Sequence, residues 1–117
     1  MTSVTREQLL NLLSQWGLGR VDEREVHEQA EAIMEAMDDS TNYPESNPHS
    51  ITLEVLVHLD ALNHQLITAE DIPAMCEFLE TPEGDETGAW VAWREYWAGI
   101  DMTERRWKLT GNCFYST

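Results

Sequence analysis

Residues 23–37 read EREVHEQAEAIMEAM, and this stretch decides the fold class. Its apolar side chains recur every three or four positions, while its glutamates fall on the opposite side at 100° per residue. A two-faced pattern of this kind is typical of a helix that buries one side and exposes the other. The segment therefore predicts an α-helix whose buried side consists of Val26, Ala30, Ile33, Met34 and Met37.

Four other short segments carry the pattern of a helix start. In residues 4–8, 21–25, 67–71 and 100–104, an apolar residue precedes Thr or Asp, and an acidic residue or Gln follows within three positions. The Thr or Asp side chain can accept a hydrogen bond from a free amide of the first turn, and a nearby acid favours the positive end of the helix dipole. The spacing between these segments is irregular, so they indicate helix caps and not an internal repeat.

The remaining apolar spacing divides the chain into further helices separated by two loops. We expect helices over residues 6–16, 51–64, 71–79 (or from 69) and 102–109, and one that carries Trp90 to Trp97 and ends near Gly99. Proline and other turn formers predict loops over residues 38–50 and 81–88. Since no segment has the strict alternation of a strand, the sequence predicts an all-α protein. We expect one domain over residues 1–117, a compact bundle of five or six short antiparallel helices.

The composition excludes several classes of partner. The chain has 117 residues, with 7 Lys and Arg against 22 Asp and Glu, and its formal net charge is −15. Nucleic acids and anionic membranes are polyanions and would repel such a chain. Its apolar runs are too short for a membrane span, and its N-terminal residues lack a basic segment followed by an apolar one. We therefore expect a soluble, cytoplasmic protein that binds neither nucleic acid nor membrane.

Metal-binding patterns are incomplete in this sequence. His27 and Glu31 fit part of an HExxH motif, but the second histidine is missing. Asp60 and His64 lie four residues apart, but His58 lies about 120° around the helix from His64, which disfavours a three-ligand site on that helix. Residues 38–43 alternate oxygen ligands as a calcium loop does, yet a tyrosine stands where the EF-hand needs glycine. The sequence predicts no metal site.

Catalytic patterns are missing as well. Cys76 lies in an apolar helical stretch and is predicted to be a core thiol, with a bridge to Cys113 left open. The sequence has no nucleophile elbow, phosphate-binding glycine loop or dinucleotide fingerprint. We therefore predict that the chain is not an enzyme, has no catalytic residues and needs no cofactor.

The charge distribution provides the main indication of function. No lysine or arginine occurs between Arg24 and Arg94, although this part of the chain holds most of the acidic residues. Such a surface cannot neutralise itself through ion pairs four residues apart. It is either a solvated face or a docking surface for a positively charged macromolecule. The predicted partner-binding residues are Glu28, Glu31, Glu35, Asp38, Asp39, Tyr43 and Glu45, with the tyrosine as an aromatic anchor.

A small, acidic, helical chain with an acidic stretch beside a tyrosine resembles the immunity proteins that neutralise bacterial nuclease toxins. The resemblance lies in size, charge and helical make-up over much of the chain. It implies an inhibitor whose acidic face covers a basic toxin surface and imitates the charge of the toxin's nucleic-acid substrate. On this basis the chain is expected to be an acidic protein-binding module that inhibits a basic protein partner.

An alternative hypothesis uses the aromatic residues. Trp90, Trp93 and Trp97 form one helical stripe, which is either part of the core or an exposed aromatic groove. An exposed stripe would make the chain a structural or adaptor module that self-associates, for example as a homodimer. This hypothesis predicts an exposed patch around Trp90 and Trp97.

Overall fold

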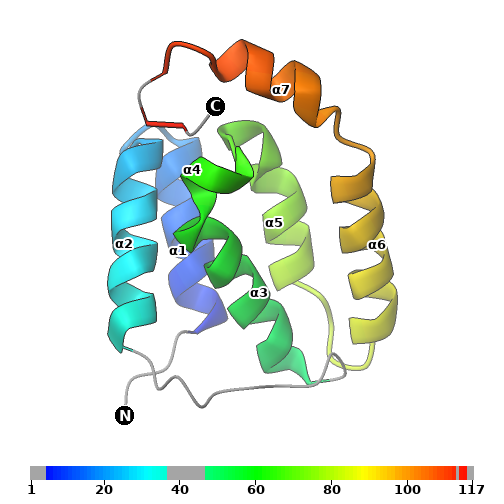
Figure 1. Cartoon of the computed structure of the whole chain (residues 1–117). Helices are drawn as coiled ribbons and strands as arrows, with labels where there is room; N and C mark the ends of the chain where they lie inside the picture. The colour runs from blue at the N-terminus through cyan, green and yellow to red at the C-terminus, as the bar shows by residue number, and fades with distance from the viewer. Residues whose placement is uncertain (1–4, 37–46, 113, 116–117) are drawn as a thin grey trace.

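The computed structural model describes residues 5–36, 47–112 and 114–115. These residues form α1 (Arg6–Gly17), α2 (Glu23–Ala36), α3 (Pro48–Asp60), α4 (Leu62–Gln65), a 3₁₀ turn η1 (Ala69–Asp71), α5 (Ile72–Leu79), α6 (Glu86–Ala98) and α7 (Met102–Leu109). Helices α1, α2, α3, α5 and α6 run alternately up and down, and α7 lies across one end (Figure 1). The predicted all-α antiparallel bundle is confirmed, and the described residues contain no strand.

All four predicted helix starts are confirmed. At each one, the side-chain oxygen of the predicted cap accepts a backbone N–H of the first turn: Thr5 from Gln8, Asp22 from Glu25, Thr68 from Glu70, and Asp101 from Glu104. These contacts join residues only two or three positions apart, so the local sequence determines them. Val4 of the first helix-start segment, Met37 of the predicted buried side and Cys113 of the possible bridge lie outside the described residues.

The helix predicted over residues 51–64 differs from the structure at its start. It begins at Pro48, inside the predicted loop, of which residues 38–46 lie outside the described part. The side-chain oxygen of Asn47 accepts the N–H of His49 at 2.9 Å, and Pro48 occupies the first turn, where a missing N–H costs nothing. Asn-Pro is therefore a helix start here, although the same residue types also favour turns.

Two further boundaries differ from the prediction, and the first gives the described residues seven α-helices where five or six were predicted. The helix breaks at Ala61, and α4 adds one separate turn before Leu66, which adopts a left-handed backbone conformation. The second predicted loop is also shorter than expected, because α6 begins at Glu86. The carboxylate of Glu86 accepts the N–H of Gly84 at 2.6 Å and closes the turn that leads into the helix.

The core is built around α3, which packs against α1, α2, α5 and α6. Leu56 and Leu59 of α3 are fully buried, and Val26 and Ala30 of α2 are buried as predicted. Ile33 and Met34, which were predicted to share that buried side, are only half-buried. Because α2 lies at one side of the bundle (Figure 1), it covers the core with one narrow face and leaves its other side exposed.

A buried polar cluster joins α7 to the rest of the bundle. Asp71 is 0% exposed, and Arg105 of α7 donates two hydrogen bonds to its carboxylate, at 2.7 and 3.1 Å. The hydroxyl of Tyr96 and the N–H of Thr68 also donate to this carboxylate. We refer to Asp71, Tyr96 and Arg105 as the Asp71 cluster. Burial and the hydrogen bond to Asp71 raise the pKa of Tyr96 from 10.0 to about 12.

Candidate protein-binding surface

Helix α2 brings three of the predicted partner-binding residues onto one face. Glu28, Glu31 and Glu35 are all exposed, and their spacing of three and four residues places them along one side of the helix. The opposite side carries the buried Val26 and Ala30. The remaining predicted residues, Asp38, Asp39, Tyr43 and Glu45, lie outside the described part of the chain. We call Glu28, Glu31 and Glu35 the α2 acidic face.

Five of the seven lysine and arginine residues have partners away from this face. Ion pairs join Arg6 to Glu7, Arg105 to Asp71 and Glu70, and Lys108 to Glu104, while Arg24 and Arg94 lie over the rings of Phe114 and Trp90. Only a histidine approaches the α2 acidic face, with 3.5 Å between His27 Nε2 and Glu31 Oε2. Among the described residues, the three glutamates therefore have no lysine or arginine partner.

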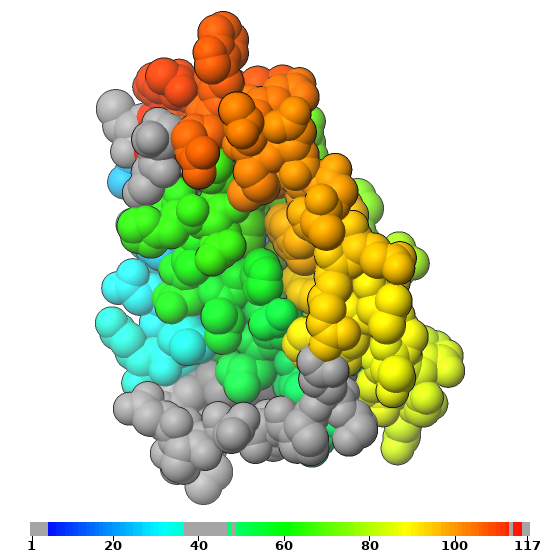
Figure 2. Space-filling model, turned by 45° about the vertical axis from the view of Figure 1, so that its right-hand side comes forward, coloured from blue at the N-terminus to red at the C-terminus, as the bar shows by residue number. Residues whose placement is uncertain are grey.

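A hollow of about 500 Å³ adjoins the α2 acidic face. Helix α2 contributes Glu31 and Glu35 to its lining, and the corner between α3 and α4 contributes Asp60, Asn63 and His64. Helices α2 and α3 and the α4 turn lie side by side on this face of the molecule, in cyan and green in Figure 2. The sequence predicted Asp60 and His64 on one helix, but the structure breaks that helix at Ala61. Both residues nevertheless line the same hollow as two glutamates of α2, which the sequence did not show.

Two polar side chains that line this hollow, those of His27 and Asn63, differ in their contacts with the rest of the chain. His27 is held in place, because its Nδ1 lies 3.4 Å from the carbonyl oxygen of Leu59 and its ring packs edge-on to Phe114. The Oδ1 atom of Asn63, by contrast, is buried without a hydrogen-bond partner in the described structure. An unsatisfied buried acceptor costs about 1–3 kcal/mol. The carboxylates of Glu31, Glu35 and Asp60, which line the same hollow, suit a donor such as an ammonium or guanidinium group.

The candidates for chemistry in the sequence are its possible metal ligands and Cys76. Within the described ranges, no group of three or more His, Cys, Asp and Glu residues is placed to hold a metal ion. Cys76 is half-buried, and burial together with the negative charge of Glu80 raises the pKa of its thiol. A raised pKa reduces the thiolate population and thus the nucleophilicity of this cysteine.

Most of the aromatic stripe is part of the core. Trp90 is 8% exposed and Trp93 is 4% exposed, and both pack against Phe78. Trp97 is half-buried and stacks on His58 with 5.2 Å between the ring centroids. Trp90 therefore cannot belong to the exposed patch that the self-association hypothesis predicts. The ring that is exposed, at 81%, is Trp107 of α7.

Comparison of the chain with protein-family models, curated proteins and solved structures finds no match. In the described segments, no helix has the length and apolar character that crossing a membrane requires.

Proposed function

We propose that the chain is an acidic protein-binding module that docks its α2 acidic face on the basic surface of a partner protein. The observation that carries this proposal is the row of exposed glutamates without lysine or arginine partners among the described residues. Like charges three and four residues apart repel one another and destabilise a helix. A basic partner removes that repulsion, and complementary fields accelerate association.

The adjoining hollow supports the same proposal. A lysine or arginine side chain of the partner can enter it and donate to Glu31, Glu35 and Asp60. Hydrogen bonds between charged groups are about twice as strong as neutral ones, so one inserted cation would contribute both affinity and orientation.

The kind of partner follows from the charge and from the resemblance to bacterial immunity proteins. In this proposal the chain acts in the cytoplasm, without a cofactor, and inhibits a basic effector such as a nuclease toxin by covering its positive surface. Asp38, Asp39, Tyr43 and Glu45, which follow α2 in the sequence, are the further residues proposed to bind the partner. The inhibitor thereby occupies the surface that the effector needs for its polyanionic substrate.

The test begins with the wild-type chain as bait in native lysate at low ionic strength. Bound proteins are identified by mass spectrometry, and the affinity of each purified candidate is measured by calorimetry at low and high salt. We expect a basic protein whose affinity falls steeply with salt. Glu31→Lys/Glu35→Lys should weaken binding by about tenfold or more.

The matched control is Glu83→Lys/Glu95→Lys, which changes the net charge equally at exposed acids outside the α2 acidic face. Affinity should change by less than about threefold in this control. Equal weakening by both double variants would assign the effect to net charge alone. Recovery of only the bait itself, regardless of salt, would instead favour the self-associating adaptor.

A further inference from the structure

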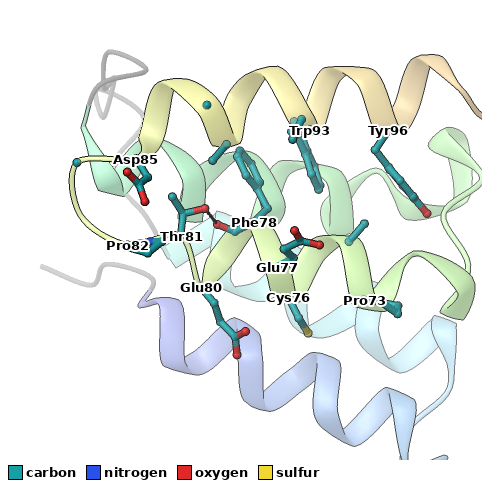
Figure 3. A pocket seen from close by; sticks show the side chains of 15 residues that line it. Pro73, Cys76, Glu77, Phe78, Glu80, Thr81, Pro82, Asp85, Trp93 and Tyr96 are labelled. Carbon is teal, nitrogen blue, oxygen red and sulfur yellow. Dashed lines mark hydrogen bonds between the residues drawn. The ribbon is translucent and has the colours of Figure 1, made fainter.

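A second and larger hollow lies between α5 and α6. Its volume is about 810 Å³, within the range of sites that bind ligands or peptide side chains. Figure 3 shows Phe78 of α5 and Trp93 of α6 lying between the two helices. Small residues, Gly88, Ala89 and Ala92, line the α6 side. We call this hollow the α5–α6 groove.

The floor of the α5–α6 groove is held rigidly. The rings of Phe78 and Trp93 stack with 4.3 Å between their centroids at an interplanar angle of 12°, and both are buried. Tyr96, at one end, is fixed by its hydrogen bond to Asp71. The groove therefore exists before any ligand arrives, which reduces the entropy that binding would cost.

The charged residues that line the groove are all acidic. Glu77 and Glu80 of α5 and Asp85 before α6 are exposed and line the opening, and no lysine, arginine or histidine lines it (Figure 3). None of the three carboxylates forms an ion pair with another described residue. An apolar floor with an acidic rim is complementary to a ligand with an apolar side flanked by positive charges.

We propose that the α5–α6 groove binds a basic amphipathic helix of a partner protein. Apolar side chains at positions i, i+4 and i+7 of that helix would cover the floor of Phe78 and Trp93. Its lysine and arginine side chains would face Glu77, Glu80 and Asp85. A helix fits better than an extended segment, because the small residues of α6 permit close approach and the described residues offer no strand edge.

The inference rests on the proposed function, because it takes the partner to be a basic protein. It adds a second contact on another side of the molecule, since α2 and α6 lie at opposite sides of the bundle (Figure 1). A second copy of this chain is a weaker candidate for the groove. It could present Trp107 between Arg106 and Lys108, but two chains of net charge −15 repel each other at long range.

The probe for the test is a labelled synthetic 14-residue helix of leucine and lysine, with leucines on one face. Its affinity is measured by fluorescence anisotropy at low salt with the full chain. We expect binding that falls by about tenfold or more when the same residues are reordered so that leucines surround the helix. Replacing every lysine by glutamate should abolish binding. Equal affinity for the reordered peptide would overturn the proposal, because charge alone would then explain binding.

Variants of the chain assign the probe to the groove. Ala92→Trp fills the groove from an exposed position, and Ala98→Trp is the matched control on the same helix outside the lining. Glu77→Lys/Glu80→Lys reverses the rim, and the control Glu83→Lys/Glu95→Lys reverses the same number of exposed charges at residues outside the lining. We expect at least about tenfold weaker binding for both groove variants and less than about threefold for both controls.

The remaining outcomes separate this inference from the proposed function. If Ala92→Trp and Glu77→Lys/Glu80→Lys bound the probe with wild-type affinity, the groove assignment would be overturned. The proposal that the α2 acidic face binds the native partner would be unaffected by that result. Self-association in sedimentation velocity that is lost in Trp107→Ala would assign the groove to a second copy and overturn the proposal. Far-UV circular dichroism and thermal unfolding show that each variant is folded.

Discussion

The Asp71 cluster and the α2 acidic face place the same chemical group in opposite environments. The carboxylate of Asp71 is fully buried and accepts hydrogen bonds from Arg105, Tyr96 and Thr68. The carboxylates of the α2 acidic face are exposed and have no lysine or arginine partner in the described structure. At Asp71 the chain places one of its few cations beside the buried carboxylate.

This contrast separates stability from recognition. Breaking a buried ion pair leaves an uncompensated charge in the protein interior, where it is poorly solvated. The loss of such a pair therefore lowers the stability of the whole fold. Exposed carboxylates are solvated and contribute little to stability, and their mutual repulsion opposes helix formation. The α2 acidic face is therefore expected to tolerate substitution in a stability assay and to be sensitive in a binding assay.

The largest expected effect is that of Asp71→Asn. The substitution keeps the shape of the side chain but leaves Arg105, whose side chain is 12% exposed, without its counter-charge. We expect the free energy of unfolding to fall by about 3–5 kcal/mol. Urea unfolding followed by tryptophan fluorescence measures this change.

The matched control for Asp71→Asn is Glu28→Gln on the α2 acidic face, which should change stability by no more than about 0.5 kcal/mol. A second control, Asp71→Asn/Arg105→Met, removes both charges and should recover part of the loss. Equal effects of Asp71→Asn and Glu28→Gln would remove the distinction between the two environments.

Tyr96→Phe tests one hydrogen bond of the Asp71 cluster. The substitution removes the donor to Asp71 but keeps the ring, which packs edge-on against Trp97. A hydrogen bond to a charged group contributes about 1.5–3 kcal/mol. Because Tyr96 is only half-buried, we expect the free energy of unfolding to fall by about 1.5 kcal/mol. Urea unfolding at neutral pH measures it. A neutral result would mean that Arg105 and Thr68 satisfy Asp71 without the tyrosine.

The alkaline pH dependence tests the same bond. The pKa of Tyr96 is raised from 10.0 to about 12, so the folded chain holds this proton more tightly than the unfolded chain. The stability that Tyr96 contributes is therefore fully present below pH 10 and is lost as the pH rises towards 12. The unfolding curves of wild type and Tyr96→Phe should converge over this interval. A constant gap would show that the hydroxyl proton is not involved.

The helix starts could be predicted from the sequence because their contacts are local. Thr5 and Asp101 each cap an amide three positions along the chain, and the residues in between fix the geometry. The pairing of Asp71 with Arg105 spans 34 positions. The sequence indicated Asp71 as a residue of a helix start and did not indicate that Arg105 is its partner. Only the placement of α7 across the bundle end shows that the two residues meet.

The candidate protein-binding surface could also be predicted only where it depends on local sequence. The spacing of Glu28, Glu31 and Glu35 shows from the sequence alone that they share a helix face, because the helical period is fixed. The hollow beside them depends on the packing of α2 against the corner between α3 and α4, which brings Asn63 next to Glu35. The α5–α6 groove was missed for the same reason, since it forms only where the helices of Phe78 and Trp93 pack together.

The smallest expected effect is also the one that separates stability from binding most directly. Glu35 lies in the last turn of α2, where the helix dipole disfavours an acid and no basic residue offsets it. In Glu35→Lys the new cation meets the dipole favourably and lies four residues after Glu31, an orientation that favours an ion pair. Stability should rise by about 0.5 kcal/mol, whereas Glu25→Lys in the first turn should lower it by a similar amount.

Glu35→Lys should at the same time weaken binding to the basic partner, because it places a positive charge beside the hollow that receives the partner's cation. A residue whose replacement stabilises the helix and weakens the complex acts in recognition and not in folding. If Glu35→Lys instead destabilised the chain, this glutamate would contribute to the fold as Asp71 does. The Asp71 cluster and the α2 acidic face would then differ only in exposure. A binding partner would no longer be needed to explain the row of glutamates on α2.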